Sequence, residues 1–260
     1  MTVLLRTDGV KKAYGGVQAL NGATISVEEG TVAGLIGPNG SGKTTLFNVV
    51  TGYQRADEGQ VYFRDKPITN YAPDKVFAAG IGRTFQLTRI FPRLTVIENM
   101  LIAAQAKDRP RNVLAWFGKD AWTHHRRHAM DLLAFVGIER HANVLAGSLS
   151  YGQRKLLELA YVLVADPAVV LLDEPAGGVN PTLINHITDR IRELNSDGKT
   201  FLIVEHNMEF VMGLCSTITV LESGAAVASG PPEIIKTDKR VLDAYLGADL
   251  EEDADDHAAT

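Results

Sequence analysis

The hydrophobic residues of this chain are concentrated in three short runs, at residues 32–36, 168–172 and 201–204. No polar residue interrupts any of these runs, which is typical of strands that are buried on both faces of a parallel sheet. Helical patterns lie between the runs, and strands that alternate with helices predict an α/β fold with a mainly parallel sheet. In such folds ligands bind at the carboxyl ends of the strands, so the residues after each run are the first candidates for a functional site.

The chain before and after the first buried run has a different pattern. Residues 3–30 alternate between polar and apolar positions and predict antiparallel strands, and residues 59–63 continue the same sheet. Pro73 is expected to begin a short helix that ends at Gly80. A short extended piece is expected at residues 83–86.

Residues 87–147 predict an inserted α-helical subdomain. Thr95 and Glu98 have the spacing of a capping box and therefore predict the start of a helix. A loose stretch at residues 107–119 follows, and a second helix is expected over residues 129–136.

The helices beyond this insertion have clear start signals. Ser150 and Gln153 have the spacing of a second capping box, before an apolar-periodic helix at residues 156–165 that Pro167 ends. Asn180 is expected to cap the next helix, because asparagine is favoured at this position.

The loop after the first buried run has the spacing G-x-x-x-x-G-K-[ST] of a phosphate-binding loop. Its glycines let backbone N–H groups turn toward phosphate oxygens, and the helix that follows contributes the positive end of its dipole. We expect Lys43 to reach the β- and γ-phosphates and the Thr44 hydroxyl to hold Mg²⁺. The predicted nucleotide-binding residues in this loop are Gly37, Pro38, Asn39, Gly40, Ser41, Gly42, Lys43, Thr44 and Thr45.

The second buried run ends at an acidic pair, Asp173 and Glu174. Asp173 is expected to hold Mg²⁺ through its water shell, because Mg²⁺ keeps most of its waters in proteins. Glu174 points to the opposite side and is positioned to polarise an attacking water as a general base. The third run is followed by Glu205 and His206 at the corresponding place.

Composition restricts the class of partner. The chain has 260 residues, 45% of them hydrophobic and 22% charged, with a net charge of −5. The last fourteen residues hold six acids and no Lys or Arg, so the rest of the chain carries a net charge of about +1. A nearly neutral body argues against a nucleic-acid-binding surface. The single cysteine, Cys215, suits a reducing cytosol, and no apolar run is long enough to cross a bilayer.

The phosphate-binding loop, the segment Leu149-Ser150-Tyr151-Gly152-Gln153 before Asp173, and His206 after it together resemble the ATP-binding subunit of ABC transporters. The resemblance implies a single ATPase domain over residues 1–247, with a RecA-like core at 1–86 and 148–247, an antiparallel β subdomain and the helical insertion at 87–147. Residues 248–260 are then an acidic, disordered tail.

The resemblance also implies roles for individual residues. Gln86 senses Mg²⁺ and the membrane partner, His206 contacts the γ-phosphate, and Tyr14 stacks on adenine. The signature Ser150, Tyr151, Gly152 and Gln153 closes over ATP that a second subunit binds. The implied catalytic residues are Glu174, His206 and Gln86, and the implied metal ligands are Thr44, Gln86 and Asp173.

Two departures from the usual pattern point to a subgroup. Tyr151 replaces the first signature glycine, and Asn180 stands where many relatives have aspartate. With Gly82 to Gln86 and the ending at residues 244–247, these features resemble the larger ATPase subunit of branched-chain amino-acid importers. That resemblance implies ATP and Mg²⁺ as cofactors, transmembrane permeases and a second ATPase subunit, identical or different, as partners, an indirect link to a solute-binding protein, and a place on the cytoplasmic face of the inner membrane.

The sequence is also compatible with other functions. ATPases of urea or amide importers and of lipopolysaccharide exporters are similar. Ribosome-acting relatives usually carry two cassettes in one chain, and DNA-repair relatives insert a long coiled coil, whereas this insertion has no sustained heptads. Kinases and GTPases with a phosphate-binding loop lack the segment at residues 149–153.

The acidic tail yields a first prediction. Deleting residues 249–260 should leave ATPase activity and melting temperature nearly unchanged, because the segment has few large apolar groups to offset its ordering entropy. Thermal unfolding of the two proteins checks this. A fall of more than about five degrees, on the order of 1 kcal/mol, would indicate that the tail docks on the domain.

Overall fold

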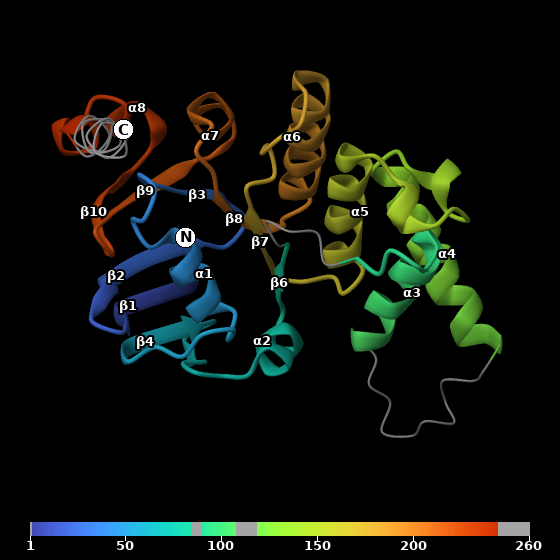
Figure 1. The fold of residues 1–260 in the computed structure, drawn as a ribbon, viewed down its shortest axis with the longest axis horizontal. Coiled ribbons are helices and arrows are strands. Elements are labelled where there is room, and N and C mark those ends of the chain that lie inside the picture. The colour runs from blue at the N-terminus through green and yellow to red at the C-terminus, as the bar shows by residue number, and fades with distance from the viewer. Residues whose placement is uncertain (1, 85–89, 108–118, 244–260) are drawn as a thin grey trace, which may run out of the picture.

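We describe a computed structural model of the chain at residues 2–84, 90–107 and 119–243 (Figure 1). It contains a six-stranded sheet in the order β10-β9-β3-β8-β7-β6 and a four-stranded sheet in the order β2-β1-β4-β5. The strands of the six-stranded sheet are β3 (Val32–Ile36), β6 (Ile81–Arg83), β7 (Val169–Asp173), β8 (Thr200–Val204), β9 (Thr217–Glu222) and β10 (Ala225–Gly230).

The six-stranded sheet is mainly parallel, as predicted. β6, β7, β8, β3 and β9 pair in parallel, and only β10 is antiparallel to its neighbour β9. Every residue of β3, β7 and β8 is buried. Successive side chains of a strand point to opposite faces, and alternate residues of β7 and β8 accordingly belong to two different hydrophobic clusters.

The smaller sheet is antiparallel throughout and covers one face of the larger one. Its strands are β1 (Val3–Tyr14), β2 (Val17–Glu28), β4 (Glu58–Phe63) and β5 (Lys66–Pro67). Helix α1 (Lys43–Val50) packs between the two sheets, with Leu46 and Phe47 fully buried in the shared core. The predicted antiparallel strands at residues 3–30 are therefore confirmed.

Helices account for the remaining core. They are α2 (Pro73–Ala79), α3 (Val96–Lys107), α4 (Lys119–Phe135), α5 (Tyr151–Leu163), α6 (Pro181–Ser196), α7 (Met208–Leu214) and α8 (Pro232–Ile235), with short 3₁₀ turns η2 (Glu139–His141) and η3 (Ala146–Ser148). Both predicted capping boxes are present, at Thr95 with Glu98 and at Ser150 with Gln153. Within the described residues, no helix combines the length and hydrophobicity that crossing a membrane requires.

Helix α5 begins earlier than its apolar periodicity predicts, because the capping box at Ser150 places the first turn at Tyr151. It packs against α3 and α4 on one side and the large sheet on the other (Figure 1). Helix α5 therefore connects the inserted helices to the strand that carries Asp173.

Candidate functional site

The phosphate-binding loop joins β3 to α1 and depends on two tightly packed glycines. A Cβ at Gly37 would lie 2.1 Å from the carbonyl oxygen of Leu221, and one at Gly42 would lie 2.5 Å from that of Ala19. Both have positive φ angles, 150° and 101°, so another residue would be strained there as well as obstructed. These glycines thus fix the loop against β9 and β2.

Lys43 points back into this loop. Its ammonium donates hydrogen bonds of 2.8 Å to the carbonyl oxygens of Gly37 and Pro38. Burial lowers the pKa of Lys43, and the nearby carboxylates of Glu174 and Asp173 partly offset that effect. The structure therefore brings together the lysine, at the start of α1, and both predicted carboxylates, at the carboxyl end of β7.

Asp173 is held by a residue to which the sequence analysis gave no role. Its side chain is 3% exposed, and its Oδ2 accepts a hydrogen bond of 2.8 Å from Arg83 at the end of β6. Arg83 also donates to Asn48 (2.7 Å) and Thr51 (3.0 Å), both from the α1 region. The sequence contains no local pattern that predicts this role of Arg83, because it is the parallel pairing of β6 with β7 that brings Arg83 beside Asp173.

Glu174 and His206 follow neighbouring strands and face each other. The distance between Glu174 Oε1 and His206 Nδ1 is 4.0 Å, and the histidine side chain is 66% exposed. Between their loops lies Glu205, which is fully buried and accepts backbone N–H groups from Ala176 (2.6 Å), His206 (3.1 Å) and Asn207 (3.2 Å). The sequence places Glu205 at a strand end, but no local pattern predicts that it supports both loops.

The signature segment lies apart from the phosphate-binding loop. Ser150 caps α5, on the opposite side of β7 from α1 in Figure 1. Tyr14 ends β1 and is 43% exposed, as stacking on a base requires. Asn180 caps α6 by accepting the backbone N–H of Leu183, as predicted. Gln86 lies outside the described residues.

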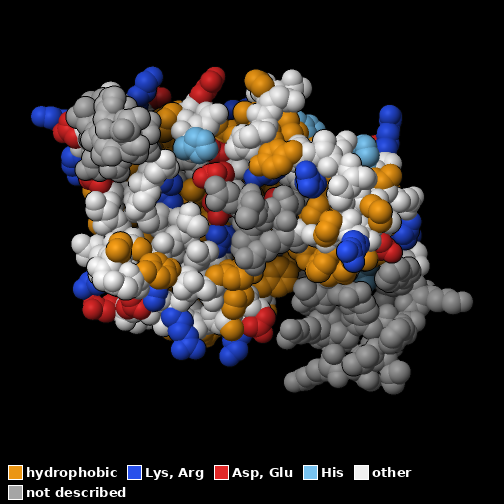
Figure 2. Space-filling model, in the orientation of Figure 1, with side chains coloured by type: hydrophobic (Ala, Val, Ile, Leu, Met, Phe, Trp, Pro, Cys, Tyr) orange, Lys and Arg blue, Asp and Glu red, His pale blue; other side chains and the backbone are white. Residues whose placement is uncertain are grey.

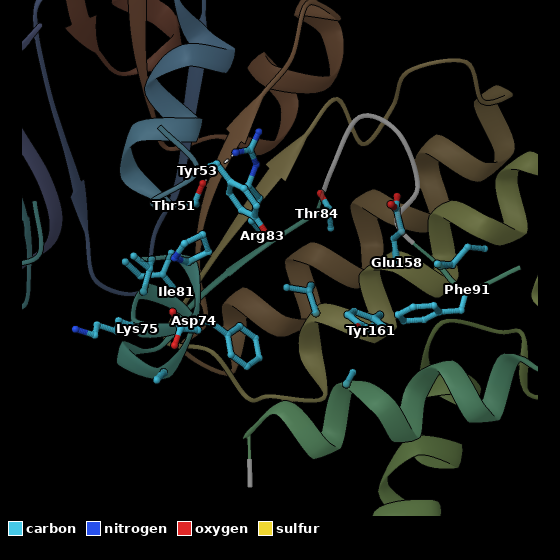
Figure 3. A pocket seen from close by; sticks show the side chains of 17 residues that line it. Thr51, Tyr53, Asp74, Lys75, Ile81, Arg83, Thr84, Phe91, Glu158 and Tyr161 are labelled. Atoms are coloured by element: carbon cyan, nitrogen blue, oxygen red, sulfur yellow. Dashed lines mark hydrogen bonds between the residues drawn. The ribbon is translucent and has the colours of Figure 1, made fainter. Parts of the chain in front are cut away.

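A pocket of about 720 Å³ lies between the sheet and the inserted helices (Figure 3). Its walls come from α2, β6, α3, α5, the turn after α1 and the segment before α3, and they include Tyr53, Ile90, Phe91 and Tyr161. Figure 2 shows hydrophobic side chains gathered between α2 and the α3–α5 group, at the place where this pocket opens.

The sequence matches the family model of the ABC transporter domain over residues 20–177. It is 39% identical to the probable branched-chain amino acid transport ATP-binding protein LivG of Archaeoglobus fulgidus, over 94% of this chain and 96% of that protein. The chain belongs to the ABC transporter family. BraF of Pseudomonas aeruginosa, a high-affinity branched-chain amino acid transport ATP-binding protein, is 36% identical over 94% of this chain and 98% of its own.

Solved structures agree with this membership. The ADP conformation of MJ1267, an ATP-binding cassette of an ABC transporter, superposes with a TM-score of 0.82 at 36% identity, covering 95% of this chain and all of the other. The dimeric cassette MJ0796, bound to ADP and phosphate, gives a TM-score of 0.78 at 26% identity, over 88% of this chain and 99% of its own. The predicted fold and the predicted ABC-type ATPase class are thus confirmed.

The buried pair of Arg83 and Asp173 yields a stability prediction. Arg83→Met should lower the free energy of unfolding by about 3 kcal/mol, because it leaves a buried carboxylate without its counter-charge. Urea denaturation measures this change. Adding Asp173→Asn should recover part of the loss, since the two effects are coupled.

Arg64→Met serves as the matched control. The Arg64 side chain is 58% exposed, so its loss should change stability by no more than about 0.5 kcal/mol. An equal loss in both variants would contradict the assigned role of Arg83.

Proposed function

We propose that this chain is the ATP-hydrolysing subunit of an importer for branched-chain amino acids. The solute assignment rests on relatives such as LivG and BraF, which match nearly the whole chain and are described as branched-chain amino acid transport proteins. The hydrolytic assignment rests on one observation above all, the convergence of Lys43, Asp173 and Glu174 at the carboxyl ends of β3 and β7.

The residues present fit a magnesium–nucleotide complex. The Lys43 ammonium donates to two carbonyl oxygens of its own loop. Phosphate oxygens are stronger acceptors and can take the place of these carbonyl groups. The Thr44 hydroxyl and the Asp173 carboxylate supply the oxygen ligands that Mg²⁺ prefers. Mg²⁺ held by these two residues would offset the charge of the phosphates.

Glu174 is the proposed general base. It follows Asp173 directly, and its carboxylate is partly exposed, so water can reach it. His206, 4.0 Å from that carboxylate, is exposed toward the same side and would donate to the γ-phosphate. Glu205 positions both groups, because its carboxylate holds the two loops together through backbone amides.

A second subunit would complete the site. Helix α5, the signature helix that begins at Tyr151, lies away from the phosphate-binding loop of its own chain. The related cassette MJ0796 is described as dimeric. Ser150 and Gly152 of a partner would then approach ATP bound at Lys43, with the first turn of α5 offering its positive dipole end.

The pocket beside Phe91 is the proposed contact with the permease. Asn99 is fully buried and fixes the Phe91 backbone through bonds to its N–H (2.7 Å) and its carbonyl (3.1 Å). The Phe91 side chain is nevertheless 47% exposed, whereas Ile90 packs against the core. A rigid backbone that presents an exposed aromatic ring beside an apolar groove suits the docking of a short permease helix. With this contact, we propose that the chain works at the cytoplasmic face of the membrane.

Replacing Glu174 with glutamine should preserve ATP binding and abolish turnover. The amide cannot accept a proton from water, and general-base assistance is typically worth about 10²–10⁴ in rate. Phosphate release and ATP titration measure the two properties separately. Glu209→Gln, an exposed glutamate of α7, is the matched control. Turnover of the Glu174 variant within a few-fold of the parent would refute the assignment.

Replacing Phe91 with aspartate should preserve ATP binding by the isolated subunit but prevent co-purification with the permeases and uptake of labelled leucine. A charge in an apolar groove opposes docking without disturbing the core, because the ring is already half exposed. Leu242→Asp, at a site that is 49% exposed near the C-terminal end, should assemble and transport normally. Normal assembly of the Phe91 variant would mean that the permease binds elsewhere.

A further inference from the structure

Two side chains of the signature helix contact the loop that follows β7 in the same subunit. The first is Lys155, one turn into α5, which is only 7% exposed. Its ammonium donates a hydrogen bond of 3.1 Å to the backbone carbonyl of Glu174. A buried ammonium on a backbone carbonyl forms a charge-assisted bond, which is stronger than one between neutral groups.

The second side chain is Tyr151. Its hydroxyl donates a hydrogen bond of 3.2 Å to the carbonyl of Gly177. Its ring lies against Gly178, where a Cβ would be 3.2 Å from Tyr151 Cε1. The Lys155 ammonium lies 5.8 Å from the centre of the same ring, within range of a cation–π interaction. Tyr151 and Lys155 thus contact the two ends of one short loop.

The backbone of this loop needs such support. Glu174 has a φ of 49°, a left-handed conformation that residues other than glycine seldom adopt. Such conformations persist only where surrounding contacts hold them. The N–H of Glu174 donates to Val204 (2.9 Å), and its carbonyl accepts from Gly177 (3.1 Å) as well as from Lys155. The bond from Lys155 comes from a helix outside the loop and the sheet.

We infer that Lys155 and Tyr151 are positioning residues, which set the direction of the Glu174 carboxylate according to the position of the signature helix. This inference rests on the proposed function, in which α5 closes over ATP held by the partner subunit. Movement of α5 on closure would then be transmitted through Lys155 to the general base of its own subunit. Hydrolysis at one site would depend on engagement at the other, through contacts within a single chain.

Lys155→Met tests the inference, because it preserves the length of the side chain and removes the donor. In the transporter complex, we expect kcat to fall about tenfold while KM for ATP and the melting temperature stay within about twofold and two degrees of the parent, since only the direction of one carboxylate changes. Lys155→Arg should restore kcat, because a guanidinium can also donate to the Glu174 carbonyl. Tyr151→Phe, which removes only the bond to Gly177, should lower kcat by about threefold.

The results that would contradict this inference differ from the result that would contradict the proposed function. An unchanged kcat in Lys155→Met, or a fall in kcat accompanied by a raised KM or a lower melting temperature, would overturn the inference in favour of a packing or nucleotide-contact role. Failure of Lys155→Arg to restore kcat would do the same. If Glu174→Gln in the same complex retained turnover, the proposed function itself would fail, which separates the two hypotheses.

Discussion

The structure depends on a constraint imposed by three strands that are buried on both faces. No residue of β3, β7 or β8 before its last position can be charged without losing its hydration, so ionisable groups are confined to the carboxyl ends. Those ends lie together because the strands are parallel neighbours. The site is thus a consequence of how the core is buried, and Lys43, Asp173, Glu174 and His206 collect at one edge for this reason.

Charge that is buried at this edge is compensated in two ways. Asp173 is paired with the guanidinium of Arg83, which also binds side chains of the α1 region. Glu205 has no cation in hydrogen-bond contact among the described residues and is instead satisfied by three backbone N–H groups. Burial raises the pKa of the nearby Cys215 thiol to about 12, and the Glu205 carboxylate adds to this rise. That thiol therefore stays protonated, and its role is to pack against the core.

Helix α5, which begins with the signature segment, contacts three parts of the structure that could couple the permease to the ATPase site. It packs on α3 and α4 of the insertion, it lines the pocket beside Phe91 through Tyr161, and it contacts the loop after β7 through Lys155. A rigid helix with these three contacts can link the proposed permease groove to the proposed general base. Tyr151 adds a contact that a glycine at that position could not make.

Local sequence patterns were sufficient to predict the central strands, the helix starts around the site and its candidate chemistry. The buried runs, both capping boxes, the phosphate-binding loop and the acidic pair after β7 are local patterns of a few residues, and local patterns survive folding when the core agrees with them. Which distant residues meet depends instead on the tertiary fold. Arg83 reaches Asp173 only because β6 pairs with β7, Glu205 joins two loops only because β8 lies beside β7, and Lys155 reaches Glu174 only through the packing of α5 on the sheet. Sequence spacing carries no information about strand order or helix placement, and these contacts depend on both.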